Sequence, residues 1–89
     1  MSSLLQCPCC DFFSLSQRGA RDICALCYWE DDGSDLSDLD RVSPANHITL
    51  RDARRNFERC GASDEAAKGL VASSSERELY RRELRANMW

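Results

Sequence analysis

The residues of this chain that are most able to do chemistry are cysteines, and five of the six fall within the first third of the sequence. Two Cys-x-x-Cys pairs, Cys7/Cys10 and Cys24/Cys27, are separated by thirteen residues. Each pair can form a knuckle, a tight turn that directs both thiolates at one point. Two knuckles then supply four sulfur ligands in a tetrahedron. The spacing therefore predicts a four-thiolate metal site.

Zinc is the metal that we expect at such a site, and iron is an alternative because the same four-thiolate geometry accommodates it. Cys9 lies between the two ligands of the first pair and could substitute for either of them. When protein fills all four positions, no place remains for a catalytic water, so we expect a structural ion. In comparable small sites its binding is worth roughly 10–16 kcal/mol, more than the net stability of a domain this size.

Disulfide bonds and redox catalysis are the alternative uses of these cysteines. Disulfides need an oxidising compartment, and residues 1–6 are too short for the apolar region of a secretion signal. Cys7-Pro8-Cys9-Cys10 also matches the Cys-Pro-x-Cys form of thioredoxin-like active sites. That fold places a strand before the motif, whereas only six residues precede Cys7 here and the stretch that follows is strand-like. A thiol–disulfide redox protein is therefore the weaker alternative.

The elements that must position the cysteines belong to one small domain. With 89 residues, 43% hydrophobic and 30% charged, the composition is that of a folded globular protein. We expect residues 1–89 to form a single α+β domain, with metal-binding knuckles at 7–29, an acidic connector at 30–46 and a helical part at 47–89. No apolar run approaches the ~18 residues of a membrane span, so we expect a cytoplasmic protein.

A hairpin is predicted between the two cysteine pairs. The run at 11–15 reads as a strand, residues 16–19 as a turn, and residues 20–23 as a returning strand. The fold class that we expect is a small zinc-ribbon or rubredoxin-like two-knuckle β-hairpin followed by two to three helices.

Beyond the connector the hydrophobic period becomes helical. Thr49 is placed to cap a first helix and Gly61 to end it. The apolar stripe between them consists of Leu50, Ala53, Phe57 and Cys60.

A second helix is predicted to start near Ser75, with Ser75 and Glu78 as a capping-box pair. A short helical segment is expected between the two helices, at residues 64–71. The apolar stripe of the second helix consists of Tyr80, Leu84 and Met88.

Charge is divided unevenly along the chain. Residues 1–40 contain eight acids and two bases, a net charge of −6, and residues 41–89 contain seven acids and ten bases, a net charge of +3. A nucleic-acid-binding module normally carries its own basic footprint, so nucleic acid is disfavoured and another protein with a basic surface is the expected partner. The side chains expected to contact it follow the second cysteine pair: Trp29, Glu30, Asp31, Asp32, Asp35 and Asp38.

Catalysis is not expected from this sequence. It has no glycine-rich phosphate loop, and with His47 as its single histidine it has no hydrolase triad. A small acidic chain of this kind has the form of an immunity or inhibitor protein that neutralises a basic toxin domain. The alternative is a zinc-ribbon nucleic-acid binder that uses the arginines of the two predicted helices, Arg51, Arg54, Arg55, Arg59, Arg77, Arg81 and Arg85.

Three motifs in fixed order carry a family resemblance. They are Cys7-Pro8-Cys9-Cys10, the run from Arg21 to Gly33 around the second pair, and Leu50-Arg51-Asp52-Ala53-Arg54-Arg55-Asn56-Phe57, with Asn46 before it and Gly61 after it. Together they resemble the cysteine-rich CPCC domain family of small, mostly bacterial proteins. The resemblance covers residues 7–65 and implies metal binding through the paired cysteines, without implying an activity. Two positions depart from the family: Asp11 stands where glycine is common, and Ala25 where proline is common.

Overall fold

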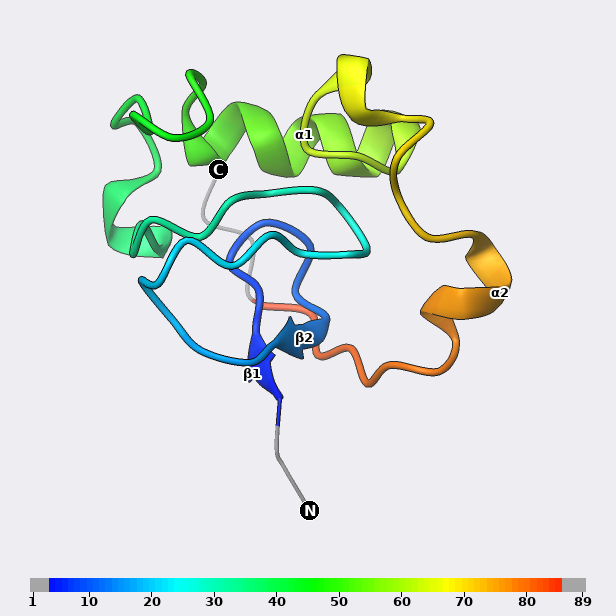
Figure 1. Cartoon of the computed structure of the whole chain (residues 1–89). Coiled ribbons are helices and arrows are strands. Elements are labelled where there is room, and N and C mark those ends of the chain that lie inside the picture. Colours follow the sequence, from blue (N-terminus) through cyan, green and yellow to red (C-terminus); the bar gives the residue numbers. More distant parts are fainter. Residues whose placement is uncertain (1–3, 86–89) are drawn as a thin grey trace.

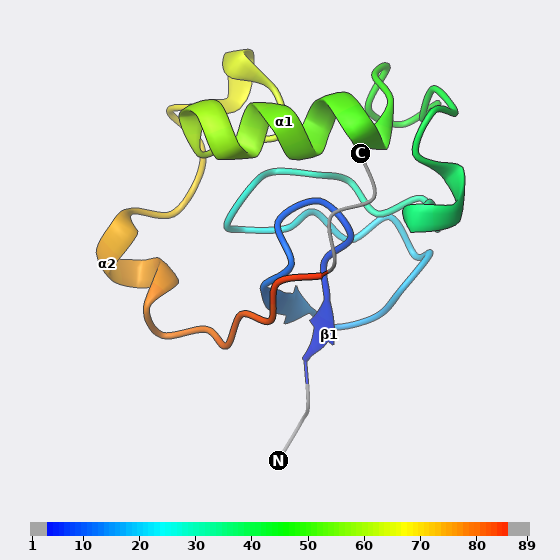
Figure 2. The same ribbon diagram turned by 180° about the vertical axis from the view of Figure 1, so that it is seen from behind.

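The computed structural model describes residues 4–85 of the chain. Its α1 helix lies along one side of the molecule, and the loops that carry the cysteines lie beneath it (Figures 1 and 2). The fold is therefore a small α+β fold, as predicted. The elements are β1 (Leu5–Gln6), β2 (Phe13–Leu15), the 3-10 helix η1 (Leu36–Asp38), α1 (Leu50–Cys60), the 3-10 helix η2 (Glu65–Ala67) and α2 (Ser74–Arg77).

The antiparallel hairpin surrounds the first knuckle, and the prediction of a hairpin joining the two knuckles was wrong. β1 precedes Cys7 and pairs with β2, with Leu5 opposite Leu15. Residues 20–23 instead pair forward across their own knuckle, through a bridge between Ile23 and Glu30. A pairing across one knuckle closes a shorter loop than a hairpin between the two knuckles would. The entropy cost of loop closure is therefore smaller for the local pairing.

The first helix forms as the sequence predicts. Thr49 caps α1 by accepting a hydrogen bond from the backbone N–H of Asp52, 3.1 Å away. Gly61 ends the helix in the left-handed conformation, with φ 81°, and its N–H donates to the carbonyl of Phe57. Along the predicted stripe, Leu50, Ala53 and Phe57 are buried, which fixes this face of the helix over the cysteine loops.

Substituting Gly61 with alanine is expected to lower the free energy of unfolding by about 1–2 kcal/mol, because a side chain disfavours the left-handed backbone. The new Cβ would also lie 2.5 Å from Nη2 of Arg77. Urea unfolding measures the loss. Gly69→Ala is the matched control, because a Cβ there meets nothing within 4 Å. Equal effects of the two substitutions would contradict this account of the helix end.

The second helix is shorter than predicted and begins earlier. The capping box is formed by Ser73 and Glu76, not by Ser75 and Glu78. The short segment expected at residues 64–71 appears as η2, which Asp64 caps by accepting the N–H of Ala66.

Beyond α2 the chain runs extended beside β2 instead of continuing as a helix. The N–H of Phe13 donates to the carbonyl of Arg81 at 2.9 Å, and Phe12 is bridged to Arg82. The backbone N–H and C=O groups on this edge of β2 form hydrogen bonds with the segment, because such groups need hydrogen-bond partners. The predicted helical stripe is therefore not formed: Tyr80 packs against the core, but Leu84 is 70% exposed, and Met88 lies outside the described residues.

The core is built largely around sulfur. Phe12 and Phe57 belong to this core and meet edge to face, with ring centroids 6.3 Å apart. No helix within residues 4–85 is long and apolar enough to span a membrane. The buried cluster consists of Cys7, Cys9, Cys10, Phe12, Leu15, Cys24, Leu26, Cys27, Trp29, Leu39, Leu50, Ala53 and Phe57.

Candidate metal centre

Four cysteine sulfurs converge at the centre of this core. The Sγ atoms of Cys7, Cys10, Cys24 and Cys27 all lie within 4.8 Å of one another, and all four side chains are buried. Cys7 Sγ and Cys27 Sγ are 3.7 Å apart, and Cys10 Sγ and Cys24 Sγ are 3.8 Å apart. Zn–S bonds of about 2.3 Å in a tetrahedron place the sulfurs about 3.8 Å apart. The donor set therefore fits one tetrahedral ion.

The two knuckles have the same backbone hydrogen bonds. In the first, the N–H of Cys7 donates to the carbonyl of Phe12 at 2.8 Å, and the N–H of Asp11 donates back to the carbonyl of Cys7 at 3.0 Å. In the second, Cys24 donates to Trp29 at 2.9 Å and Tyr28 to Cys24 at 2.8 Å. Each turn thus holds its two thiols on one side.

The residue after each knuckle has a left-handed backbone. Asp11 has φ 68° and Tyr28 has φ 70°. An L side chain there is strained by roughly 1–2 kcal/mol relative to glycine. Asp11 therefore stands at a position where the backbone favours glycine, the residue common there in the family that the sequence resembles. Other contacts must hold the aspartate in place.

Hydrogen bonds among the thiols split their pKa values. The neighbouring thiols, Cys10 first, lower the pKa of Cys24, and the hydroxyl of Ser14, 3.0 Å from its sulfur, acts in the same direction. The bond with Cys24 raises the pKa of Cys10, and burial raises that of Cys27. The pKa shifts of Cys10 and Cys24 are therefore opposite in direction. A metal ion bound by this group would hold its ligands as thiolates.

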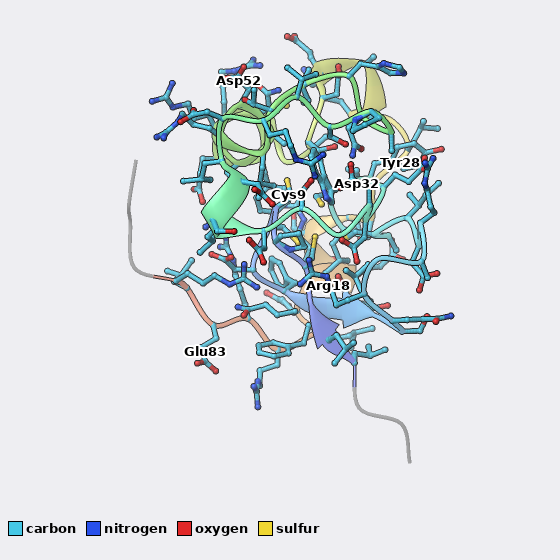
Figure 3. All side chains as sticks on the ribbon, turned by 90° about the vertical axis from the view of Figure 1, so that its left-hand side faces the viewer. Cys9, Arg18, Tyr28, Asp32, Asp52 and Glu83 are labelled. Carbon is cyan, nitrogen blue, oxygen red and sulfur yellow. The ribbon has the colours of Figure 1, made fainter. Side chains whose placement is uncertain are left out.

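Cys9 is buried but stands outside the group of four. It lies in the interior among the sulfur atoms, whereas Tyr28 lies toward the edge of the molecule (Figure 3). Burial raises the pKa of the Cys9 thiol. The first knuckle therefore contributes Cys7 and Cys10 to the group of four, and the second knuckle contributes both of its cysteines.

An ion pair missed by the sequence reasoning clamps the first knuckle to α1. Nη1 and Nη2 of Arg54 each lie 2.8 Å from a carboxylate oxygen of Asp11, and both side chains are buried. Arg54 also donates to the carbonyl of Pro8, so α1 holds both ends of the turn. A signal was present, because Arg54 falls four residues after Leu50, on the apolar stripe.

The comparison with protein families decides what this cysteine-rich unit is. The family model described as cysteine-rich CPCC matches residues 5–78. The chain belongs to the cysteine-rich CPCC family. The match extends past the predicted end at residue 65 and takes in η2 and α2. No curated protein matches the chain significantly, and no solved structure does.

Two of the partner-binding residues predicted in this CPCC chain, Trp29 and Asp31, are fully buried in this structure. Trp29 is 0% exposed and packs in the core beside the cysteines. Asp31 is also 0% exposed and accepts hydrogen bonds from Arg18 Nε at 2.8 Å and from the N–H of Gly19 at 2.7 Å. The polypeptide turns inward directly after the second knuckle, so these side chains organise the loop and present no surface in this structure.

The other predicted acids of the CPCC connector differ in exposure. Glu30, Asp32 and Asp38 are half-buried, while Asp35 is exposed. Burial raises the pKa of Asp32, but hydrogen bonds from Ser34 and from Ser43 outweigh it and hold that pKa below its ordinary value. These hydrogen bonds join residues within the connector and reduce the acidic surface that is exposed to solvent.

Four of the predicted arginines lie on α1, as expected, but those predicted along the second helix do not form one helical face. Arg81 and Arg85 lie beyond α2, in the extended segment. The guanidinium of Arg77 stacks over the ring of Phe57 at 4.9 Å, and that of Arg81 over Phe13 at 4.1 Å. These cations cover aromatic rings of the fold.

Proposed function

We propose that this CPCC protein binds one zinc ion through Cys7, Cys10, Cys24 and Cys27. The observation that carries the proposal is the set of four buried sulfurs at the separations of a tetrahedral site. The four thiolates would fill every coordination position, which leaves no site for a catalytic water. The ion would therefore hold the two knuckles together, and the protein would act without being an enzyme.

Metal analysis of the natively purified full chain tests the ligand set. We expect one equivalent of zinc per chain, retained by Cys9→Ser because Cys9 lies outside the group of four. Cys10→Ser is the matched variant within the same turn, and it is expected to lose most of the metal. Iron in place of zinc would overturn the choice of ion. Equal metal loss from the two variants would overturn the ligand assignment.

We propose in addition that the zinc-stabilised protein binds another protein with a basic surface, as an immunity or inhibitor protein does with a toxin domain. The support is charge, since residues 1–40 carry a net −6. A cytoplasmic location suits this proposal, because free thiolates persist in a reducing compartment. Co-expression with the products of the adjacent genes should yield a salt-sensitive complex. Failure of every such product to bind would contradict the immunity role.

A further inference from the structure

A solvent-facing groove lies beside the second knuckle, and none of the four cysteines lines it. Its cavity volume is about 290 Å³. Ligand pockets usually measure about 300–1,000 Å³, so this one suits one or two side chains better than a cofactor. Three separate parts of the chain line it: the flanks of the second knuckle, the turn before α1 and the segment around η2.

Large apolar side chains stand exposed around this groove. Ile23 is 49% exposed, Tyr28 is 39% exposed and Leu70 is 62% exposed. Ile23 and Tyr28 come from either side of the second cysteine pair, and Leu70 comes from the segment after η2. Exposed apolar residues gathered at one concave site mark a surface that gains free energy when another molecule covers it.

The charge of the groove defines what can cover it. Two carboxylates, those of Glu30 and Asp64, line the groove, and within residues 4–85 no basic residue lines it, although Nη1 of Arg21 lies 3.3 Å from Oε2 of Glu30. Resting on the protein-binding function proposed above, we propose that the groove docks an apolar side chain of a partner protein that is flanked by arginine or lysine. The apolar side chain would fill the hollow, and the flanking cations would meet the two carboxylates.

Hydrogen bonds tie every part of the groove to the second knuckle. The N–H of Ser63 donates to the carbonyl of Cys27 at 2.7 Å, and that of Ala72 to the carbonyl of Ala25 at 2.9 Å. The amide of Asn46 pairs with the backbone of Glu30 in both directions, at 2.9 and 2.8 Å. Because the knuckle orders the groove, peptide binding should strengthen metal retention and metal should strengthen peptide binding.

A titration of the ¹⁵N-labelled, metal-loaded full chain tests the groove. The probe is an acetylated peptide, Gly-Ser-Arg-Leu-Arg-Ser-Gly. Its binding is followed through the amide chemical shifts of the labelled protein. We expect shifts confined to groove residues such as Ile23, Tyr28 and Leu70. Replacing the peptide leucine with alanine, or both arginines with glutamate, should weaken binding at least tenfold. Shifts spread over the surface, or equal binding of the three peptides, would overturn the proposal.

Variants of the protein separate the groove from the wider protein-binding function. Leu70→Ser should weaken peptide binding about tenfold without changing the unfolding temperature, because Leu70 is exposed. Leu79→Ser, 83% exposed and outside the groove, is the control that should leave binding unchanged. If the product of a neighbouring gene binds both variants equally, the groove is not the docking site, while the proposed protein-binding function is supported. Concentration-dependent groove shifts without peptide would show a second copy as the occupant and would overturn the basic-partner proposal.

Discussion

Replacing Cys24 with serine is expected to release the metal and abolish the cooperative unfolding transition. Its sulfur belongs to the group of four, lies 3.0 Å from the hydroxyl of Ser14 and accepts a hydrogen bond from the N–H of Leu26. Metal binding in small structural sites contributes roughly 10–16 kcal/mol, while the net stability of a whole domain is about 5–15 kcal/mol. Calorimetry with near-ultraviolet circular dichroism measures the loss, and a chelator added to the unchanged protein should reproduce it.

Cys60→Ser is the matched control for that experiment. Cys60 is half-buried at the end of α1 and outside the group of four, so the substitution should change the free energy of unfolding by less than about 1 kcal/mol. A Cys24→Ser protein that melts cooperatively near the temperature of the unchanged chain would show that no structural ion supports the fold.

The second large effect is expected from Arg54→Met, which should destabilise the protein by about 3–5 kcal/mol because it leaves a buried carboxylate without its main partner. Asp11 accepts two bonds of 2.8 Å from Arg54 and is 2% exposed. Urea unfolding of the metal-loaded protein measures the change. Arg55→Met, one position along α1 and exposed, should stay within about 0.5 kcal/mol.

The double variant with Asp11→Gly tests the cause. Glycine removes the carboxylate that has lost its main partner and relaxes the φ of 68°, so adding Asp11→Gly to Arg54→Met should restore much of the lost stability. If the double variant is as unstable as the sum of the two single variants, the ion pair is not the source of the effect.

The features that the sequence predicts well are those whose cause is local. Two Cys-x-x-Cys pairs imply two turns, and Thr49 with Gly61 marks the ends of one helix, because caps act on neighbouring backbone groups. The gathering of Cys7, Cys10, Cys24 and Cys27 was predicted from the four ligands that a tetrahedral ion needs, and not from packing. These inferences need no knowledge of how distant segments pack.

The features that the sequence could not predict depend on contacts between distant residues. Trp29 and its acidic neighbours are polar or amphipathic in sequence, and only the inward turn of the loop buries Trp29 and Asp31. The segment after α2 has a helical pattern, but the free edge of β2 offers backbone partners that a four-residue helix cannot match. Tertiary hydrogen bonding therefore overrode local preference at these positions.

The extended segment after α2 has a consequence for fragments of this protein. The family match ends at residue 78, yet the N–H of Phe13 and the carbonyl of Asp11 are paired by residues 81–83. A truncation at that boundary would leave the backbone groups along one edge of β2 unpaired. Unpaired strand edges pair with strands of other molecules and promote aggregation. Recombinant versions intended to stay monodisperse should therefore retain the residues through Arg85.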